Sequence, residues 1–247
     1  MQGYQQEPSY APRRASGGQL HRGGGQLHQG VRGFMNGVYL WMAAGVGISA
    51  AVVWLVSSNM SLMSALWAPG NHLGLIVAIS TFVLAIALQY AVPRMSSPLA
   101  LGGFIVYAAL MGASLSYLPL IYDAGNMGLV LLATVGMFGA TAVFGYVTKK
   151  DLSGMGQFLV MALFGTIIAS LINVFLIGSM GMSLMISAII AIVSAGLTAY
   201  YTQAIKQMYL VGGRQGNLAV LGALVLYISF INLFLSLLHL FGGGSRD

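Results

Sequence analysis

The chain has 247 residues, of which 58% are hydrophobic and only 6% are charged. A soluble globular domain carries about a quarter charged residues, so this composition excludes water as the main solvent. The formal net charge of +6 could suggest nucleic acid, but the basic residues lie between hydrophobic runs, as in a membrane topology signal. The lack of cysteine excludes disulfides, thiol catalysis and thiolate metal sites. We expect a membrane protein that binds no nucleic acid.

The beginning of the chain differs in composition from the rest. Residues 1–34 are rich in Gly, Gln, Arg and His and contain few large apolar side chains. Such a segment buries too little surface to offset the entropy of ordering. We therefore expect a disordered basic tail at 1–34, a membrane domain at 35–242 and a short C-terminal tail at 243–247.

Hydrophobic segments follow one another along the membrane domain. A helix that crosses a bilayer needs about 20 mostly apolar residues, and the segments here reach that length. The breaks between them are rich in Gly, Pro, Asn and Asp, which form turns. The sequence predicts an all-α membrane protein with seven transmembrane helices, at residues 36–57, 72–92, 99–121, 127–147, 156–177, 181–203 and 217–240.

The basic residues predict the orientation of the chain. Nine of them precede the first span or follow the second, fourth and sixth spans, namely Arg13, Arg14, Arg22, Arg32, Arg94, Lys149, Lys150, Lys206 and Arg214. The opposite connections carry no basic residue before Arg246. Connections rich in Lys and Arg face the cytoplasm. We therefore expect the N-terminus in the cytoplasm and the C-terminus outside.

Every Asp, Glu, Lys and Arg lies outside the predicted spans. Charged residues inside a membrane mark proton relays, voltage sensors and ion sites, so their absence excludes a carboxylate relay, an Arg ladder and a retinal Schiff base. The chain also contains neither an H-E-x-x-H metal pair nor a G-x-S-x-G elbow. We expect no enzyme activity and no cofactor.

Polar residues inside the spans leave two interpretations open. They either form hydrogen bonds between helices, worth about 0.6 kcal/mol each, or line a polar path through the bundle. The candidates for such a path are Asn173, Tyr201, Ser229 and Asn232. Small residues at helical spacing, Ala43 with Gly47 and Gly136 with Ala140, predict close contacts between helices.

Several motifs occur in a fixed order in the second half of the chain. They are Gly-Met-Phe-Gly-Ala at 136–140, Thr-Lys-Lys-Asp-Leu-Ser-Gly at 148–154, Ile-Ala-Ser-Leu-Ile-Asn at 168–173, Gly-Leu-Thr-Ala-Tyr at 196–200 and Phe-Ile-Asn-Leu-Phe at 230–234. In order and spacing, these motifs resemble the Bax inhibitor motif family of membrane proteins. The resemblance implies six helices packed around a central seventh and a pH-sensitive calcium leak across the membrane.

In that family, one Asp on the sixth helix and one on the seventh form the pH sensor. Two carboxylates held close together do not both ionise easily, so the pair titrates as a unit at a raised pKa. Here the family's Ala-Tyr-Asp-Thr-Gln is replaced by Ala-Tyr-Tyr-Thr-Gln at 199–203. The family's Leu-Tyr-Leu-Asp-Phe-Ile-Asn is replaced by Leu-Tyr-Ile-Ser-Phe-Ile-Asn at 226–232. Tyr201 and Ser229 thus stand where the two acids belong, and neither side chain titrates near neutral pH.

Two functions follow as expectations from this resemblance and its departures. The first is a bacterial inner-membrane protein whose leak of calcium or another cation is either lost or no longer gated by a carboxylate pair. The second is a non-conducting interaction protein that modulates membrane protein quality control, with a membrane protease as its partner. Both have the lipid bilayer as their surroundings, and a calcium-flux measurement separates them.

Overall fold

The computed structural model describes residues 17–212 and 216–243 of the chain. Within these residues there is no β-strand, and seven helical segments are long and apolar enough to cross a membrane. They span Gln29–Ser57, Leu73–Arg94, Ser97–Ile121, Ala124–Val147, Ser153–Ile177, Met180–Gly212 and Gly216–Phe241. Helices satisfy every backbone polar group within the segment, as hydrocarbon requires. The predicted all-α fold with seven transmembrane helices is confirmed.

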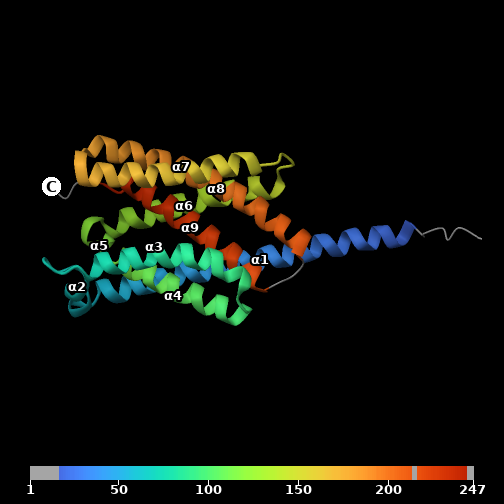
Figure 1. Ribbon diagram of the computed structural model, residues 1–247, viewed down its shortest axis with the longest axis horizontal. Coiled ribbons are helices and arrows are strands. Elements are labelled where there is room, and N and C mark those ends of the chain that lie inside the picture. Colours follow the sequence, from blue (N-terminus) through green and yellow to red (C-terminus); the bar gives the residue numbers. More distant parts are fainter. Residues whose placement is uncertain (1–16, 213–215, 244–247) are drawn as a thin grey trace, which may run out of the picture.

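The start of the chain differs from the prediction. Helix α1 runs without a break over Gly17–Ser57, so residues 17–34, expected in a disordered tail, are helical. Its first turns extend beyond the bundle (Figure 1). A helix already nucleated in the membrane adds residues at little cost, and Gln, Leu and Arg favour it. The rest of the expected tail, residues 1–16, lies outside the described residues, as do residues 244–247 of the expected C-terminal tail.

The next helices form two spans and a short surface helix that the sequence did not indicate. That short helix, α2 (Met60–Trp67), follows α1, and the Trp67 indole Nε1 donates a hydrogen bond to Ser116 Oγ at 2.9 Å. Helix α3 (Leu73–Ala91) ends in the 3₁₀ turn η1 (Val92–Arg94). The third span consists of α4 (Ser97–Leu115) and α5 (Leu118–Ile121), with the break at Ser116.

The remaining spans are longer helices. Helix α6 (Ala124–Val147) begins at Asp123, whose carboxylate accepts a hydrogen bond from the Gly125 amide at 2.8 Å. Helix α7 (Ser153–Ile172) ends in the π turn η2 (Asn173–Ile177), followed by Gly178 in the left-handed conformation at φ 67°. Helix α8 (Met180–Gly212) continues well beyond its predicted end at residue 203, and α9 (Gly216–Phe241) completes the bundle.

Helix α9 lies at the centre of the bundle, with α7 and α8 on one side and α3 and α4 on the other (Figure 1). In its apolar 18-residue stretch, 56% of the residues are buried, compared with 11% for the span that contains α7. It packs against α1, α3, α4, α6 and α8, whereas α7 packs mainly on α8. The complete ring of six helices around the seventh therefore stays a prediction.

The hydroxyl of Ser49 joins three of these helices. Its Oγ donates a hydrogen bond to the Ala108 carbonyl of α4 at 2.7 Å and shares one with Tyr227 Oη of α9 at 2.6 Å. The Tyr227 ring also contacts Phe104 and Tyr107 edge-on, with ring centroids 5.7 and 5.6 Å apart. Because helices in lipid gain no hydrophobic energy by associating, such polar and packing contacts hold α1, α4 and α9 together.

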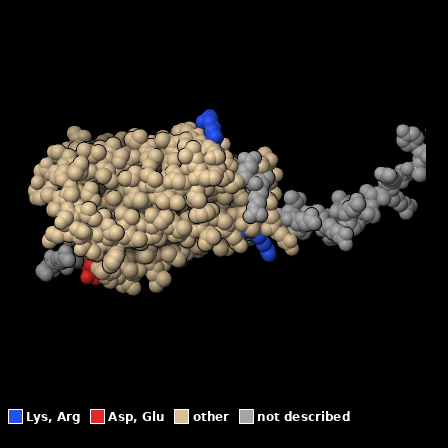
Figure 2. Space-filling view, turned by 90° about the horizontal axis from the view of Figure 1, so that it is seen from below, with Lys and Arg blue, Asp and Glu red and all other residues tan. Residues whose placement is uncertain are grey.

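The basic residues gather at one end of the bundle. Lys and Arg lie toward the end from which α1 extends, and an acidic residue is visible at the opposite end (Figure 2). The alternating course of the helices places the described basic residues at one end: Arg32, Arg94, Lys149, Lys150 and Lys206. This end is called the basic end below. The predicted orientation of the chain in the membrane depends on this placement of the basic residues at one end.

One close helix contact depends on the lack of a side chain. A Cβ at Gly145 of α6 would overlap the Ala199 carbonyl of α8, so only glycine lets these helices approach this far. A Cβ at Gly136, on the same helix, would meet nothing within 4 Å, and the same holds at Gly47 of α1. The close contacts predicted at Gly47 and Gly136 are therefore wrong. The spacing of small residues shows that one face of a helix is smooth, but it does not show whether another helix packs on that face.

The glycine contact yields a prediction for stability. We expect Gly145→Ala to lower the free energy of unfolding by about 1–3 kcal/mol, because the added methyl pushes α6 away from α8. The matched control, Gly136→Ala, removes a flexible residue from an open helix position, so it leaves stability unchanged or raises it by up to about 1 kcal/mol. Thermal unfolding in detergent, followed by circular dichroism, compares the two. Equal transitions would contradict the close approach.

Candidate functional site

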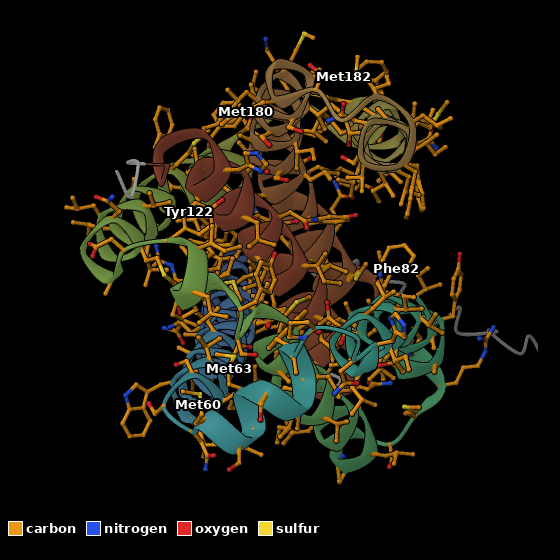
Figure 3. The ribbon with its side chains drawn as sticks, turned by 90° about the vertical axis from the view of Figure 1, so that its left-hand side faces the viewer. Met60, Met63, Phe82, Tyr122, Met180 and Met182 are labelled. Atoms are coloured by element: carbon orange, nitrogen blue, oxygen red, sulfur yellow. The ribbon has the colours of Figure 1, made fainter. Side chains whose placement is uncertain are left out.

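A partly open cavity of about 460 Å³ is bordered by α3, α4, α7, α8 and α9. Phe82 of α3, labelled in Figure 3, and Phe164 of α7 form part of its apolar wall. Two of the predicted site residues, Tyr201 of α8 and Asn232 of α9, line it together. We call this space the polar cavity, because its other polar lining residues are Thr81, Gln89, Tyr107, Ser114 and Tyr117.

Helical geometry explains which residues of α9 face the polar cavity. Ile228 and Asn232 both line it, and they lie one turn apart on the same face of the helix. Ser229 follows Ile228 by about 100° around the helix axis, is only 2% exposed and is not among the lining residues. Within the described residues, no hydrogen bond joins Ser229 to Tyr201. The structure therefore brings Tyr201 together with Asn232 at this cavity, while Ser229 packs beside it.

The polar groups around the cavity differ in whether they form hydrogen bonds. Thr81 Oγ1 and Ser114 Oγ share a hydrogen bond of 3.1 Å, and Gln89 Nε2 donates to the Ala85 carbonyl at 3.2 Å. In the described part of the chain, neither the Tyr201 hydroxyl nor the Asn232 amide forms a hydrogen bond. Both residues are half-buried, so these two groups are open to a polar guest such as water in this space.

The polar cavity contains no charge. None of its described lining residues is Asp, Glu, Lys, Arg or His. Among the described residues, no group of three His, Cys, Asp or Glu side chains lies close enough together to hold a metal ion. Hydroxyl and amide groups do not change charge near neutral pH. The cavity can thus orient water or a partly hydrated cation through dipoles only.

Asn173 lies at a different place from the other predicted site residues. Its Nδ2 donates hydrogen bonds to the Ser179 carbonyl at 3.0 Å and to Ser183 Oγ at 2.7 Å. Its Oδ1 accepts a hydrogen bond from the Ser179 amide at 3.1 Å. These bonds fasten the connection between α7 and α8. Asn173 also borders a smaller cavity of about 230 Å³ that His239 lines, separate from the polar cavity.

Gln203 has a role that the sequence did not indicate. Its Oε1 accepts a hydrogen bond from the Leu152 amide at 2.9 Å, and its Nε2 donates to the Lys150 carbonyl at 2.8 Å. It thereby ties the connection between α6 and α7 to α8. In that connection, Asp151 accepts a hydrogen bond from the Ser153 amide at 2.9 Å, which lowers the pKa of the Asp151 carboxyl. In the sequence, the signal for this role was the long amide side chain of Gln203 at the otherwise apolar end of the predicted span 181–203.

Comparison with known proteins identifies the family. Residues 31–246 match the family model described as "Inhibitor of apoptosis-promoting Bax1". The chain belongs to this family, the Bax inhibitor family. The resemblance seen in the sequence motifs is therefore confirmed, and it covers the whole described membrane domain.

Bacterial relatives match over most of their length. The chain is 40% identical over 219 residues to the "Inner membrane protein YbhL" of Escherichia coli (strain K12), covering 85% of this chain and 91% of that protein. It is 40% identical over 220 residues to an uncharacterized protein of Deinococcus radiodurans, covering 88% and 92%. It is 37% identical over 219 residues to the uncharacterized protein YrjE of Lactococcus lactis, covering 87% and 93%. This Bax inhibitor family member is thus a multi-pass membrane protein.

Proposed function

We propose that this protein is an inner-membrane member of the Bax inhibitor family that lets cations leak slowly through the polar cavity, without a carboxylate gate. The observation that carries the proposal is a pair of polar groups without a hydrogen bond, the Tyr201 hydroxyl and the Asn232 amide, that line this cavity from two of the helices long and apolar enough to span a membrane. They offer oxygen atoms to a guest, as a cation path requires. The name of the relative YbhL, an inner membrane protein, supports the inner membrane as the location.

The chemistry of the cavity limits the rate of such a leak. Calcium prefers six to eight oxygen ligands, and carboxylates supply most of the compensating charge in proteins. Tyr201 and Asn232 provide dipoles, but no charged group lines the cavity to offset the loss of hydration. A divalent cation therefore crosses slowly. An acid in place of Tyr201 would add the missing charge to the cavity wall, and in the family a second acid at the position of Ser229 completes the response to pH.

One prediction restores the acids. We expect Tyr201→Asp together with Ser229→Asp to raise calcium flux and to make it depend on pH between 6 and 8, because the family resemblance places at these two positions an acid pair that shares a proton at a raised pKa. Each single replacement buries one carboxylate without its partner, so it should give a smaller effect and a less stable protein. Efflux from calcium-loaded liposomes measures the native chain, both single variants and the double variant.

A second variant connects this flux to the polar cavity. Asn232→Leu removes the unbonded amide from the cavity wall at similar volume, so it should lower flux in both the native chain and the double Asp variant. Flux that Asn232→Leu leaves unchanged would place the path elsewhere. If no chain moves calcium above protein-free liposomes, the leak is contradicted and the non-conducting interaction protein becomes the better account.

A further prediction concerns orientation, for which we propose a cytoplasmic basic end. Because the chain has no native cysteine, single cysteines report accessibility directly. We expect a membrane-impermeant maleimide to label Ala65→Cys and Ala124→Cys in intact cells and to spare Ser97→Cys and Ser153→Cys. Labelling of all four in opened membranes is the control for reactivity. The opposite pattern in intact cells would reverse the orientation.

A further inference from the structure

A groove runs between α1 and α6 along most of the membrane domain. Near the basic end it is a cavity of about 650 Å³, and toward the other end it continues as a cavity of about 380 Å³. Val46 and Phe230 line both cavities, which therefore adjoin, and we call the two together the α1–α6 groove. Its residues on α1 extend from Arg32 to Ser57, about 38 Å at 1.5 Å per residue, which exceeds the hydrocarbon thickness of about 30 Å.

The groove exists because α1 and α6 each pack on α8 and α9. Phe230 of α9 lies at its floor, where its ring meets Phe138 of α6 with centroids 5.5 Å apart. The walls carry small residues, including Ala43 of α1 and Gly139 of α6. A Cβ at Gly139 would meet nothing within 4 Å, so no protein group fills this part of the groove. An apolar space of this size within a bilayer loses dispersion contacts unless an apolar chain enters it.

The groove is charged at one end only. Arg32 and Asn36 line the mouth at the basic end, and both are exposed. Lys206 lies beside this mouth, because its Nζ donates a hydrogen bond to the Tyr146 carbonyl at 3.1 Å and sits 4.8 Å from the centre of the Tyr146 ring. Within the described residues, no carboxylate forms an ion pair with Arg32 or Lys206. No basic residue lines the other end of the groove.

We propose that this groove binds a phospholipid with an anionic headgroup, from the leaflet at the basic end. Its phosphate lies between Arg32 and Lys206, where the guanidinium can hold two phosphate oxygens at once. One acyl chain runs along the apolar groove toward Val46, over about 21 Å of α1, which is the depth of one leaflet with part of its interface. This lipid site is independent of the cation leak proposed above, because it lies on the opposite side of α9 from Asn232 and shares no lining residue with the polar cavity.

The test compares lipids that differ only in the headgroup. Native mass spectrometry of the purified full chain, supplied with palmitoyl-oleoyl phosphatidylglycerol or the matching phosphatidylcholine, counts the lipids that remain bound. We expect phosphatidylglycerol to be retained preferentially by the native chain. Arg32→Gln should weaken this preference about fivefold, the contribution of one cation near an anionic lipid surface. Equal retention of the two lipids by the native chain would overturn the proposal.

A matched pair of substitutions tests the apolar part of the groove. Gly139→Phe places a ring in the groove, whereas Gly165→Phe makes the same change on the outside of α7, where a Cβ also meets nothing within 4 Å. We expect only Gly139→Phe to lose bound phosphatidylglycerol. If both variants keep it, the lipid binds elsewhere and the proposal fails. Should Gly139→Phe not fold, the headgroup comparison with Arg32→Gln still decides the matter.

A second copy of the chain is the competing occupant, and one variant detects it. Ala43→Cys puts a thiol inside the groove of a chain that has no other cysteine. A lipid in the groove keeps these thiols apart, so oxidation in membranes should leave the protein monomeric on a denaturing gel. Rapid disulfide formation between two copies would show that another copy of the chain covers the groove, and would overturn the lipid assignment.

Discussion

The hydrogen bonds of the Ser49 hydroxyl connect α1 and α4 to the central helix α9, and the arrangement of the bundle depends on them. In lipid, helices associate through close packing and interhelical hydrogen bonds rather than through the hydrophobic effect. The same rule operates where Gly145 lets α6 approach Ala199 of α8. Where neither device is present, neighbouring helices stay apart and leave space. The polar cavity and the α1–α6 groove are both consequences of this uneven packing.

These two spaces differ in the chemistry that they present. In the polar cavity, the side-chain oxygen and nitrogen atoms of Tyr201 and Asn232 form no hydrogen bond with the described residues, and no charged residue lines the wall. The cavity therefore suits water or a slowly passing cation. The groove is apolar along its length with Arg32 at one mouth, which suits an amphipathic molecule. They lie on different sides of α9. The protein can therefore hold a lipid without blocking the proposed path, and each proposal can fail separately.

Much of the fold was predictable, because hydropathy and turn residues determine where a chain crosses a bilayer. The pairing of helices was not, since apolar faces directed to lipid and to protein look alike in sequence. Gly136 and Gly145 occur in similar surroundings, yet only Gly145 makes a close helix contact. In the same way, motif positions indicated Tyr201 and Ser229, but only the helical rotation of α9 shows that Asn232, and not Ser229, shares the polar cavity with Tyr201. The sequence also did not show that Asn173 fastens the connection between α7 and α8, because this role depends on its hydrogen bonds to Ser179 and Ser183 in the folded chain.

The central claim of this account is that cations pass through a cavity in which no side chain titrates near neutral pH. Calcium efflux from liposomes that contain the native chain, measured at pH 6 and at pH 8 on the same preparation, tests it most directly. Tyr and Asn side chains keep the same charge over this interval, so the account predicts a weak flux that changes by less than about twofold. A steep change between the two pH values would contradict it and would place the gate outside the polar cavity.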